Sequence, residues 1–216
     1  MSQTHSGRFI TFEGGEGVGK STNIEFAAHW LREQGQTVLI TREPGGTVIA
    51  ETIRNQLLKA HHAEVMDDMT ELLLVFAARA QHLNAVIRPA LARGEWVLCD
   101  RFTDSTIAYQ GYGRGLPLAH IEQLKQLVQG NLEPDCTFLL EAPLALGMAR
   151  ARGRADAAGD EIDRFETEQI AFFERVQQGF QQLASASTRF RRIDASQALA
   201  GVQHDIECTL KELLAS

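Results

Sequence analysis

Residues 14–21, close to the N-terminus, read GGEGVGKS and dictate the local structure on either side of them. They fit the pattern G-x-x-x-x-G-K-[ST], a loop whose glycines let backbone N–H groups converge on an anion. Lys20 is expected to reach the β- and γ-phosphates of a nucleotide, and Ser21 to supply a hydroxyl ligand for Mg²⁺. The alternative is a glycine-rich turn that holds no ligand.

The flanking residues favour the phosphate-binding interpretation. Residues 8–12 are an apolar run of strand length, and residues 22–33 carry apolar side chains at helical spacing. The motif requires a strand, the loop and a helix in this order, because the helix N-terminus adds positive potential behind the phosphates. The residues expected to bind a nucleoside triphosphate are Gly14, Gly15, Glu16, Gly17, Val18, Gly19, Lys20, Ser21 and Thr22.

The composition is that of a soluble globular protein, with 44% hydrophobic and 23% charged residues among 216. A net charge of −7 without a basic stripe argues against nucleic acid as a partner. No apolar run approaches the roughly 20 residues that span a bilayer. Three widely spaced cysteines are typical of a reduced protein, so we expect one cytoplasmic domain over residues 1–216, with no membrane partner.

Apolar runs of strand length alternate with helical patterns along the chain. The expected strands are residues 8–12, 37–41, 95–99, 136–140 and 190–193, and the main expected helices are residues 22–33, 47–58, 69–93, 118–129, 143–150, 163–184 and 198–214. Asp68 is the expected N-cap of the third helix, and Pro89 is expected to kink it. The alternation predicts an α/β protein with the three-layer P-loop NTPase fold, a five-stranded parallel sheet flanked by helices.

Polar side chains follow several of these strands, and the carboxyl ends of parallel strands meet at one sheet edge. Arg42 and Arg101 follow the second and third strands, and Arg54 lies on the helix after Arg42. We expect these three cations to hold an acceptor that already carries a phosphate, the alternative being solvated surface side chains. Asp100 is expected to support Mg²⁺ through water, or else to form a structural ion pair. Glu13, directly before the loop, is a further candidate to face the metal or the acceptor.

Residues 150–162 contain three arginines, Arg150, Arg152 and Arg154, and few apolar side chains. The pattern favours an arginine-bearing lid that closes over the nucleotides, excludes water and places a guanidinium at the transferred phosphoryl group. The alternative is a flexible charged loop without a catalytic part, and the sequence does not say which arginine acts. The candidate catalytic residues are Lys20, Arg101, Arg152, Arg154 and Glu13.

Together these motifs resemble those of the bacterial thymidylate kinases over essentially the whole chain. The strings that carry the resemblance are FEG at 12–14, TREPGGT at 41–47, AAR at 77–79, DRF at 100–102, ST at 105–106, AYQG at 108–111 and DRFE at 163–166. The phosphate loop has Gly17 and no arginine, and the lid has three arginines. This is similar to the group of the family that uses a lid arginine.

The resemblance implies that the chain is a single kinase domain that transfers the γ-phosphoryl group of ATP to dTMP, giving dTDP and ADP on the route to dTTP. It also implies Mg²⁺ and a homodimer. Arg79 would hydrogen-bond the thymine with help from Thr106 and Gln110. Tyr109 would pack on the deoxyribose and disfavour a 2′-hydroxyl. The substrate-binding residues that the resemblance implies are Arg42, Arg54, Phe76, Arg79, Arg101, Ser105, Thr106, Tyr109 and Gln110.

One position departs from the family pattern. The thymine-stacking phenylalanine usually precedes the base-contacting arginine by four positions, where this chain has Val75. Phe76 precedes Arg79 by three, and both spacings neighbour the arginine on a helix surface. We expect Phe76 to stack on the base, the alternative being a core Phe76 with the base on Val75.

Two other functions remain open at this point. One is a different small-molecule kinase on the same scaffold. The cluster of Arg42, Arg54 and Arg101 disfavours such a kinase unless its acceptor already carries a phosphate. The other is a GTPase switch, which needs D-x-x-G after a strand and N-K-x-D for guanine. Residues 156–159 read DAAG but do not follow a strand, and N-K-x-D does not occur.

Overall fold

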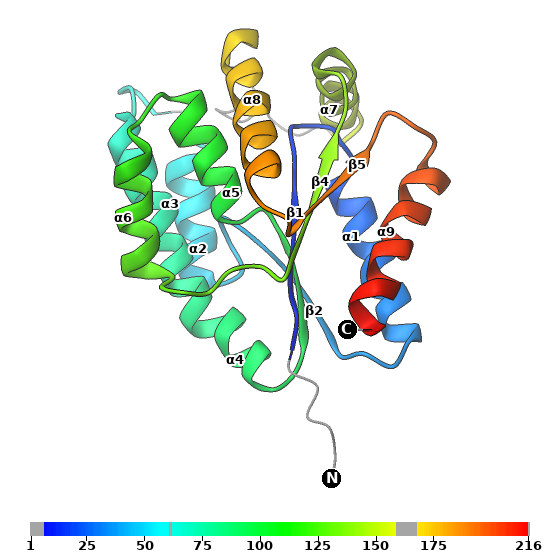
Figure 1. Cartoon of the computed structure of the whole chain (residues 1–216). Helices are drawn as coiled ribbons and strands as arrows, with labels where there is room; N and C mark the ends of the chain where they lie inside the picture. The colour runs from blue at the N-terminus through cyan, green and yellow to red at the C-terminus, as the bar shows by residue number, and fades with distance from the viewer. Residues whose placement is uncertain (1–6, 61, 159–167, 216) are drawn as a thin grey trace.

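The computed structural model describes residues 7–60, 62–158 and 168–215. In these ranges five parallel strands form one sheet in the order β2-β3-β1-β4-β5 (Figure 1). The strands are β1 (Phe9–Glu13), β2 (Val38–Arg42), β3 (Trp96–Asp100), β4 (Cys136–Glu141) and β5 (Phe190–Asp194). Asp100 pairs with Phe12 of β1 and with Arg42 of β2. The carboxyl ends of β1, β2 and β3 therefore lie side by side at one edge of the sheet. The predicted α/β fold is confirmed.

Helices cover both faces of this sheet (Figure 1). They are α1 (Lys20–Glu33), α2 (Val48–Thr52), α3 (Asp68–His82), α4 (Arg88–Ala92), α5 (Thr103–Thr106), α6 (Leu118–Val128), α7 (Leu144–Ala158), α8 (Ile170–Ala186) and α9 (Leu199–Ala215). Three π-helical turns extend some of them, at Ile53–Leu58, Leu83–Ile87 and Ile107–Gly113. None of the helices in the described ranges is long and apolar enough to cross a membrane.

The core lies on both sides of the sheet, as the helical spacing of apolar residues requires. On one side α1 and α9 bury Leu31 and Ile206 against the sheet residue Phe138. On the other side Ile87, in the turn between α3 and α4, and Phe102, directly before α5, pack with the strand residues Phe9 and Val97. The strands β1, β3 and β4 are therefore buried on both faces, which explains why they read as continuous apolar runs.

Several predicted helix boundaries were wrong. The N-cap of α3 is Asp67, not Asp68, because the Asp67 side chain accepts from Met69 N at 2.9 Å and Thr70 N at 3.3 Å. The helix expected to end at about Arg150 continues to Ala158, so the first part of the predicted lid is helical. The helix predicted from residue 163 begins at Ile170, since Glu168 and Gln169 are not helical. Residues 159–162 of the lid and the DRFE string lie outside the described residues.

The expected interruption at Pro89 takes the form of a change in helix type. The chain passes from α3 through the π-helical turn Leu83–Ile87 into α4, where Pro89 occupies the first turn. Proline has no N–H to donate, and its ring crowds the carbonyl four residues earlier. A wider turn directly before it accommodates both effects, so the helix continues instead of ending.

Candidate functional site

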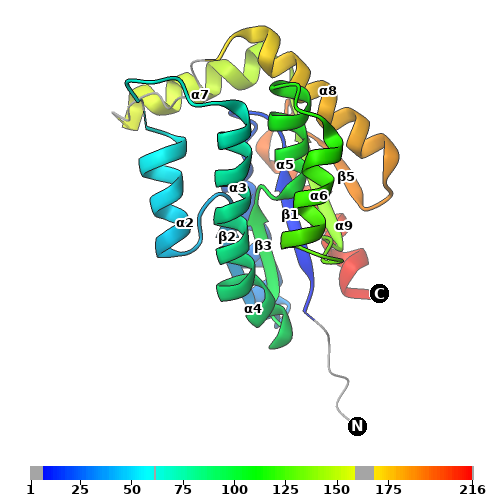
Figure 2. The ribbon, with the colours of Figure 1, turned by 90° about the vertical axis from the view of Figure 1, so that its left-hand side faces the viewer.

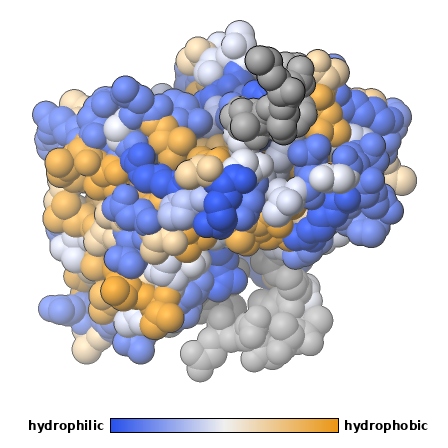
Figure 3. All heavy atoms as spheres, turned by 90° about the horizontal axis from the view of Figure 1, so that it is seen from below, coloured by the Kyte–Doolittle hydropathy of each residue, from blue (hydrophilic) through white to orange (hydrophobic). Residues whose placement is uncertain are grey.

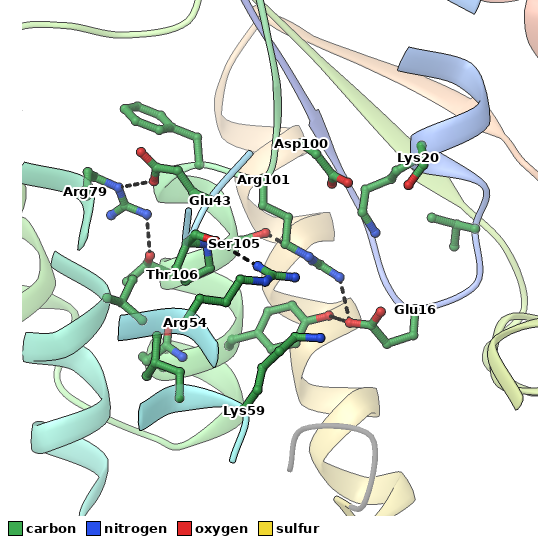
Figure 4. A pocket seen from close by; sticks show the side chains of 18 of the residues that line it. Glu16, Lys20, Glu43, Arg54, Lys59, Arg79, Asp100, Arg101, Ser105 and Thr106 are labelled. Atoms are coloured by element: carbon green, nitrogen blue, oxygen red, sulfur yellow. Dashed lines mark hydrogen bonds and ion pairs between the residues drawn. The ribbon is translucent and has the colours of Figure 1, made fainter. Parts of the chain in front are cut away.

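A cavity of about 380 Å³ opens at the carboxyl edge of the sheet (Figure 4). Its walls come from the phosphate loop, the loop after β2, α3, the end of β3 and the helical segment after it. The cavity brings together most of the predicted site residues: Glu16, Gly17, Val18, Gly19, Lys20, Ser21, Thr22, Arg54, Arg79, Asp100, Arg101, Ser105, Thr106, Tyr109 and Gln110. Gly14 and Gly15 line a smaller hollow behind the loop.

The phosphate loop has the backbone that its glycines predict. Gly17 and Gly19 have positive φ angles of 67° and 87°, and α1 begins at Lys20. A Cβ at Gly17 would lie 1.9 Å from the Gly147 carbonyl oxygen of α7, so only glycine allows that approach. The Lys20 ammonium bends back over the loop and donates to Gly15 O at 2.8 Å. Burial, and then the nearby Arg101, lowers the pKa of Lys20 to about 8.

The residues expected at the metal fit a hard divalent cation. Asp100 ends β3 and lines the cavity together with Ser21 of the phosphate loop. The buried Oδ1 of Asp100 has no hydrogen-bond partner among the described residues, which is costly for a carboxylate oxygen. One carboxylate and one hydroxyl, completed by phosphate oxygens and water, form an oxygen set of the kind that Mg²⁺ prefers.

Arg101 is held rigidly in the middle of the cavity. Its φ of 65° is the one positive value among the described non-glycine residues. One guanidinium nitrogen donates to Gly14 O at 2.9 Å and to Ser105 Oγ at 3.2 Å, and the other donates to Glu16 Oε1 at 2.6 Å. The Tyr109 ring lies against this guanidinium, with the Arg101 Cζ 4.9 Å from the ring centroid. The Tyr109 hydroxyl also donates to Glu16 Oε1, at 2.8 Å. The sequence did not reveal this bridging role of Glu16.

The two other phosphate-site arginines differ in position. Arg54 lines the cavity and donates to Pro44 O at 2.9 Å. Burial, and then the charges of Arg42 and Arg101, lowers its pKa, so the three predicted cations do lie near one another. Arg42, however, is 53% exposed, pairs with Glu51 at 2.9 Å and does not line the cavity.

Arg79 is the buried cation at the far end of the cavity from the phosphate loop, and its side chain is 1% exposed. Its Nε donates to Glu43 Oε2 at 2.6 Å, and its Nη2 donates to Thr106 Oγ1 at 2.9 Å. The remaining nitrogen, Nη1, is buried without a partner in the described ranges. Gln110, also in this wall, donates to Glu71 Oε1 at 2.8 Å.

The prediction that Phe76 stacks on a bound base was wrong. Phe76 packs in the core with Leu72 and Ile121, and Val75 takes its place in the cavity wall. The Arg79 guanidinium covers Phe76, with its Cζ 4.8 Å from the ring centroid. Phe102 was missed, although it directly follows Arg101. Phe102 lines the cavity, and its ring centroid lies 5.1 Å from the Arg79 Cζ.

Glu13 was also predicted wrongly as a residue that faces the metal or the acceptor. It is fully buried and does not line the cavity. Its carboxylate accepts from Phe102 N at 2.8 Å and from the Ser105 hydroxyl, so it holds the turn after β3. Burial, and then the neighbouring Asp104, raises the pKa of Glu13 to about 7.

The lid arginines lie on or after the middle of α7, which extends along the top of the molecule toward α2 (Figure 2). Arg150 donates to Ala195 O at 2.8 Å, away from the cavity. Arg152 is exposed and does not line the cavity. The side chain of Arg154 lies outside the described residues. The structure therefore does not bring Arg150 or Arg152 to the other site residues.

Comparison with known proteins identifies the family. A family model described as thymidylate kinase matches residues 12–206. The chain belongs to the thymidylate kinase family. It is 56% identical to the thymidylate kinase of Teredinibacter turnerae over 210 residues, 97% of this chain and 100% of that one. It is also 56% identical to the thymidylate kinase of Alcanivorax borkumensis over 211 residues, 97% of this chain and 99% of the relative.

A solved structure agrees with this assignment. The crystal structure of thymidylate kinase from Ehrlichia chaffeensis superposes with a TM-score of 0.74 at 35% identity, covering 95% of this chain and 99% of that one. The predicted family and enzyme class, a nucleoside monophosphate kinase, are thereby confirmed. The GTPase switch is excluded as the chain's class.

Proposed function

We propose that this thymidylate kinase family member transfers the γ-phosphoryl group of ATP to dTMP, giving dTDP and ADP. The observation that carries the proposal is one continuous cavity with two different ends. A phosphate loop borders one end, and a buried arginine with one unpaired donor borders the other. Such a cavity suits two nucleotides whose phosphates meet in the middle, as in-line phosphoryl transfer requires.

The donor half consists of the phosphate loop and Lys20. The converging N–H groups and the ammonium would bind the ATP phosphates, and Ser21 and Asp100 would hold Mg²⁺. The metal, when bound, neutralises charge on the β- and γ-oxygens. The unpartnered Asp100 oxygen supports this assignment, because a bound cation would give this buried carboxylate oxygen a partner.

The acceptor half consists of Arg54, Arg101, Tyr109 and Arg79. Arg54 and Arg101 lie between Arg79 and the phosphate-loop residue Lys20 (Figure 4) and would bind the dTMP phosphate. Tyr109, which packs on Arg101, would lie beside the sugar. Arginine only donates hydrogen bonds, so the Arg79 Nη1 favours a base with a carbonyl oxygen at its edge. Thymine presents O4 as an acceptor at the position where cytosine carries an amino donor.

An ADP-release assay tests the proposal by comparing dTMP, dUMP, UMP, CMP and AMP as acceptors with ATP–Mg²⁺. We expect the highest kcat/KM with dTMP, and values lower by roughly 10²-fold or more with CMP and AMP, which would leave the buried donor unpaired. Release of ADP with dTMP no faster than the ATPase background, together with turnover of another monophosphate, would refute the assignment.

We also propose a cytoplasmic homodimer. All three cysteines, Cys99, Cys136 and Cys208, are free thiols, which supports a reducing compartment. Leu73 on α3 is 50% exposed, and Leu127 on α6 is 81% exposed. Apolar side chains gather on the side of the molecule where α3 and α6 lie, on the left of Figure 3. An exposed apolar surface of this kind supports association of two copies.

A further inference from the structure

His82, the last residue of α3, is completely buried behind the cavity wall and does not line the cavity. Its Nδ1 lies 3.0 Å from Glu43 Oε1, and its Nε2 lies 2.6 Å from Thr41 Oγ1. Both partners belong to β2 or the loop after it, so His82 ties α3 to the loop that forms another wall. Neither Thr41 nor Glu43 is among the residues expected to contact substrate.

The contact with Glu43 shows which His82 nitrogen donates to the carboxylate. An ionised carboxylate can only accept, so the proton toward Glu43 sits on Nδ1 of His82. On the other side of the ring, Nε2 lies within hydrogen-bond distance of the Thr41 hydroxyl, and either atom can be the donor there. Glu43 is left with one oxygen for His82 and one for Arg79, whose Nε donates at 2.6 Å. Thr41, His82, Glu43 and Arg79 therefore form an unbroken chain of contacts, half-buried at Thr41 and buried from His82 to Arg79.

This chain ends at the guanidinium that the proposed function assigns to the base. Figure 4 shows Arg79 between Glu43 and Thr106. With Phe76 and Phe102 also in contact with it, its Nη1 can point in only one direction. The direction depends on where the Glu43 carboxylate lies. Without a donor at Nδ1 of His82, one Glu43 oxygen would be buried and unpaired, and the carboxylate would rotate away and release Arg79.

We propose that His82 is a positioning residue for base recognition. It holds the Glu43 carboxylate, which in turn aims the free donor of Arg79 at the nucleobase. The inference rests on the proposed function, because it assumes that Arg79 meets the base of the acceptor nucleotide. A purely structural role of His82 would affect binding of both nucleotides, whereas the proposed positioning role affects binding of the monophosphate and not of ATP.

Three substitutions separate these roles: His82→Leu, His82→Asn and His82→Gln. Asparagine places its amide nitrogen near the position of Nδ1 and can still donate to Glu43, whereas glutamine reaches toward Thr41 and leaves Glu43 without a donor. Leucine fills similar space with no polar atom. The exposed His204 on α9 gives a matched control, His204→Leu.

We expect His82→Leu and His82→Gln to raise the KM for dTMP about tenfold or more, with kcat within about threefold and the KM for ATP unchanged. His82→Asn should stay within about threefold of wild type, as should His204→Leu. The preference for dTMP over dCMP should fall in the Leu and Gln variants only, because a misplaced Arg79 reads the base edge poorly.

An unchanged KM for dTMP in folded His82→Gln would overturn the inference, and so would an equal rise in the KM for ATP. If the leucine variant fails to fold, the comparison of the two amides carries the test by itself. Wild-type protein that does not phosphorylate dTMP would overturn the proposed function and this inference together. Wild-type turnover with no difference between the amides would overturn the inference alone.

Discussion

Lys20 shows how burial and binding oppose each other in the phosphate loop. The free protein holds its ammonium against backbone carbonyls in a place where burial and Arg101 lower its pKa to about 8. A bound triphosphate would supply the negative charge that the ammonium lacks. Binding should therefore restore the charged form, and the protein should take up a proton with the nucleotide above pH 8.

The affinity for ADP or ATP should consequently fall above pH 8 by up to about tenfold per pH unit, since neutral Lys20 must first be protonated. Calorimetric titration of ADP between pH 7 and 9.5 measures this, with proton uptake read from two buffers. In Lys20→Arg the guanidinium stays charged over this range, so the slope should disappear even if affinity is lower. A wild-type affinity that is constant to pH 9.5 would contradict the account.

Glu13 should make the protein less stable as the pH rises. Its pKa in the folded protein is about 7, raised mainly by burial from 4.5, so the folded state holds its proton longer than the unfolded state. The cost of ionising it is absent below pH 4.5, grows between pH 4.5 and 7 and is complete above pH 7, at up to about 3 kcal/mol. Glu13→Gln removes this cost.

Urea unfolding of wild type and Glu13→Gln at pH 5 and pH 8 measures the effect. The free energy of unfolding of the glutamine variant should gain on wild type as the pH rises. The same substitution at the exposed Glu174 should show no such gain. If the difference in free energy of unfolding between wild type and Glu13→Gln is the same at both pH values, the pKa of Glu13 in the folded protein is not raised, which would contradict this account.

Single residues also mark the limit of prediction from sequence. The phosphate loop and the order Asp100-Arg101 could be located because each motif binds its ligand through positions fixed in the chain. Which of Val75 and Phe76 faces the cavity could not be decided, since positions three and four before Arg79 both neighbour it on a helix. Only the packing of Phe76 with Leu72 and Ile121 settles the choice.

Among the elements, α7 carries the arginines of the expected lid. Its Gly147 packs on the phosphate loop, so the first turn of the helix is fixed beside the donor site. The buried Ala151 follows one turn later, and position 154 follows position 151 on the same face by helical spacing. Arg150, by contrast, is engaged by Ala195 O. From this spacing alone we propose Arg154 as the catalytic arginine of the lid.

Arg154→Ala should therefore lower kcat by roughly 10²-fold or more, through loss of charge stabilisation in the transition state, with smaller effects on both KM values. Arg152→Ala and Arg150→Ala are the matched variants, and we expect each to retain kcat within about tenfold. Near-wild-type kcat in all three variants would leave α7 without a catalytic arginine. A large loss in Arg152→Ala alone would move the role to that residue.

The elements were predicted best where packing dictates the sequence pattern. Each strand was found to within about one residue because both faces of the sheet are buried. The length of α7 was missed, since alanine and arginine form helices well without an apolar stripe to signal it. The π-helical turns could not be predicted, because they change which carbonyl a backbone N–H meets and not which residues are apolar.

At the scale of the whole molecule, the account predicts a dimer in solution. Leu73→Glu on α3 should shift the protein from dimer to monomer, because it places a charge in the proposed apolar interface. Leu199→Glu on α9 is the control, since Leu199 is 51% exposed against 50% for Leu73 but lies on another side of the molecule. Sedimentation velocity at micromolar concentration distinguishes the two species. A monomeric wild type would remove the proposed interface.

The central claim, that one cavity joins ATP to dTMP for direct transfer, is tested most directly by the products. Wild-type protein is incubated with ATP, Mg²⁺ and dTMP, and the nucleotides are separated by anion-exchange chromatography. The account predicts that dTDP and ADP appear in equal amounts, and that Arg101→Met forms neither at a comparable rate. ADP that accumulates with free phosphate while dTMP stays unchanged would contradict it.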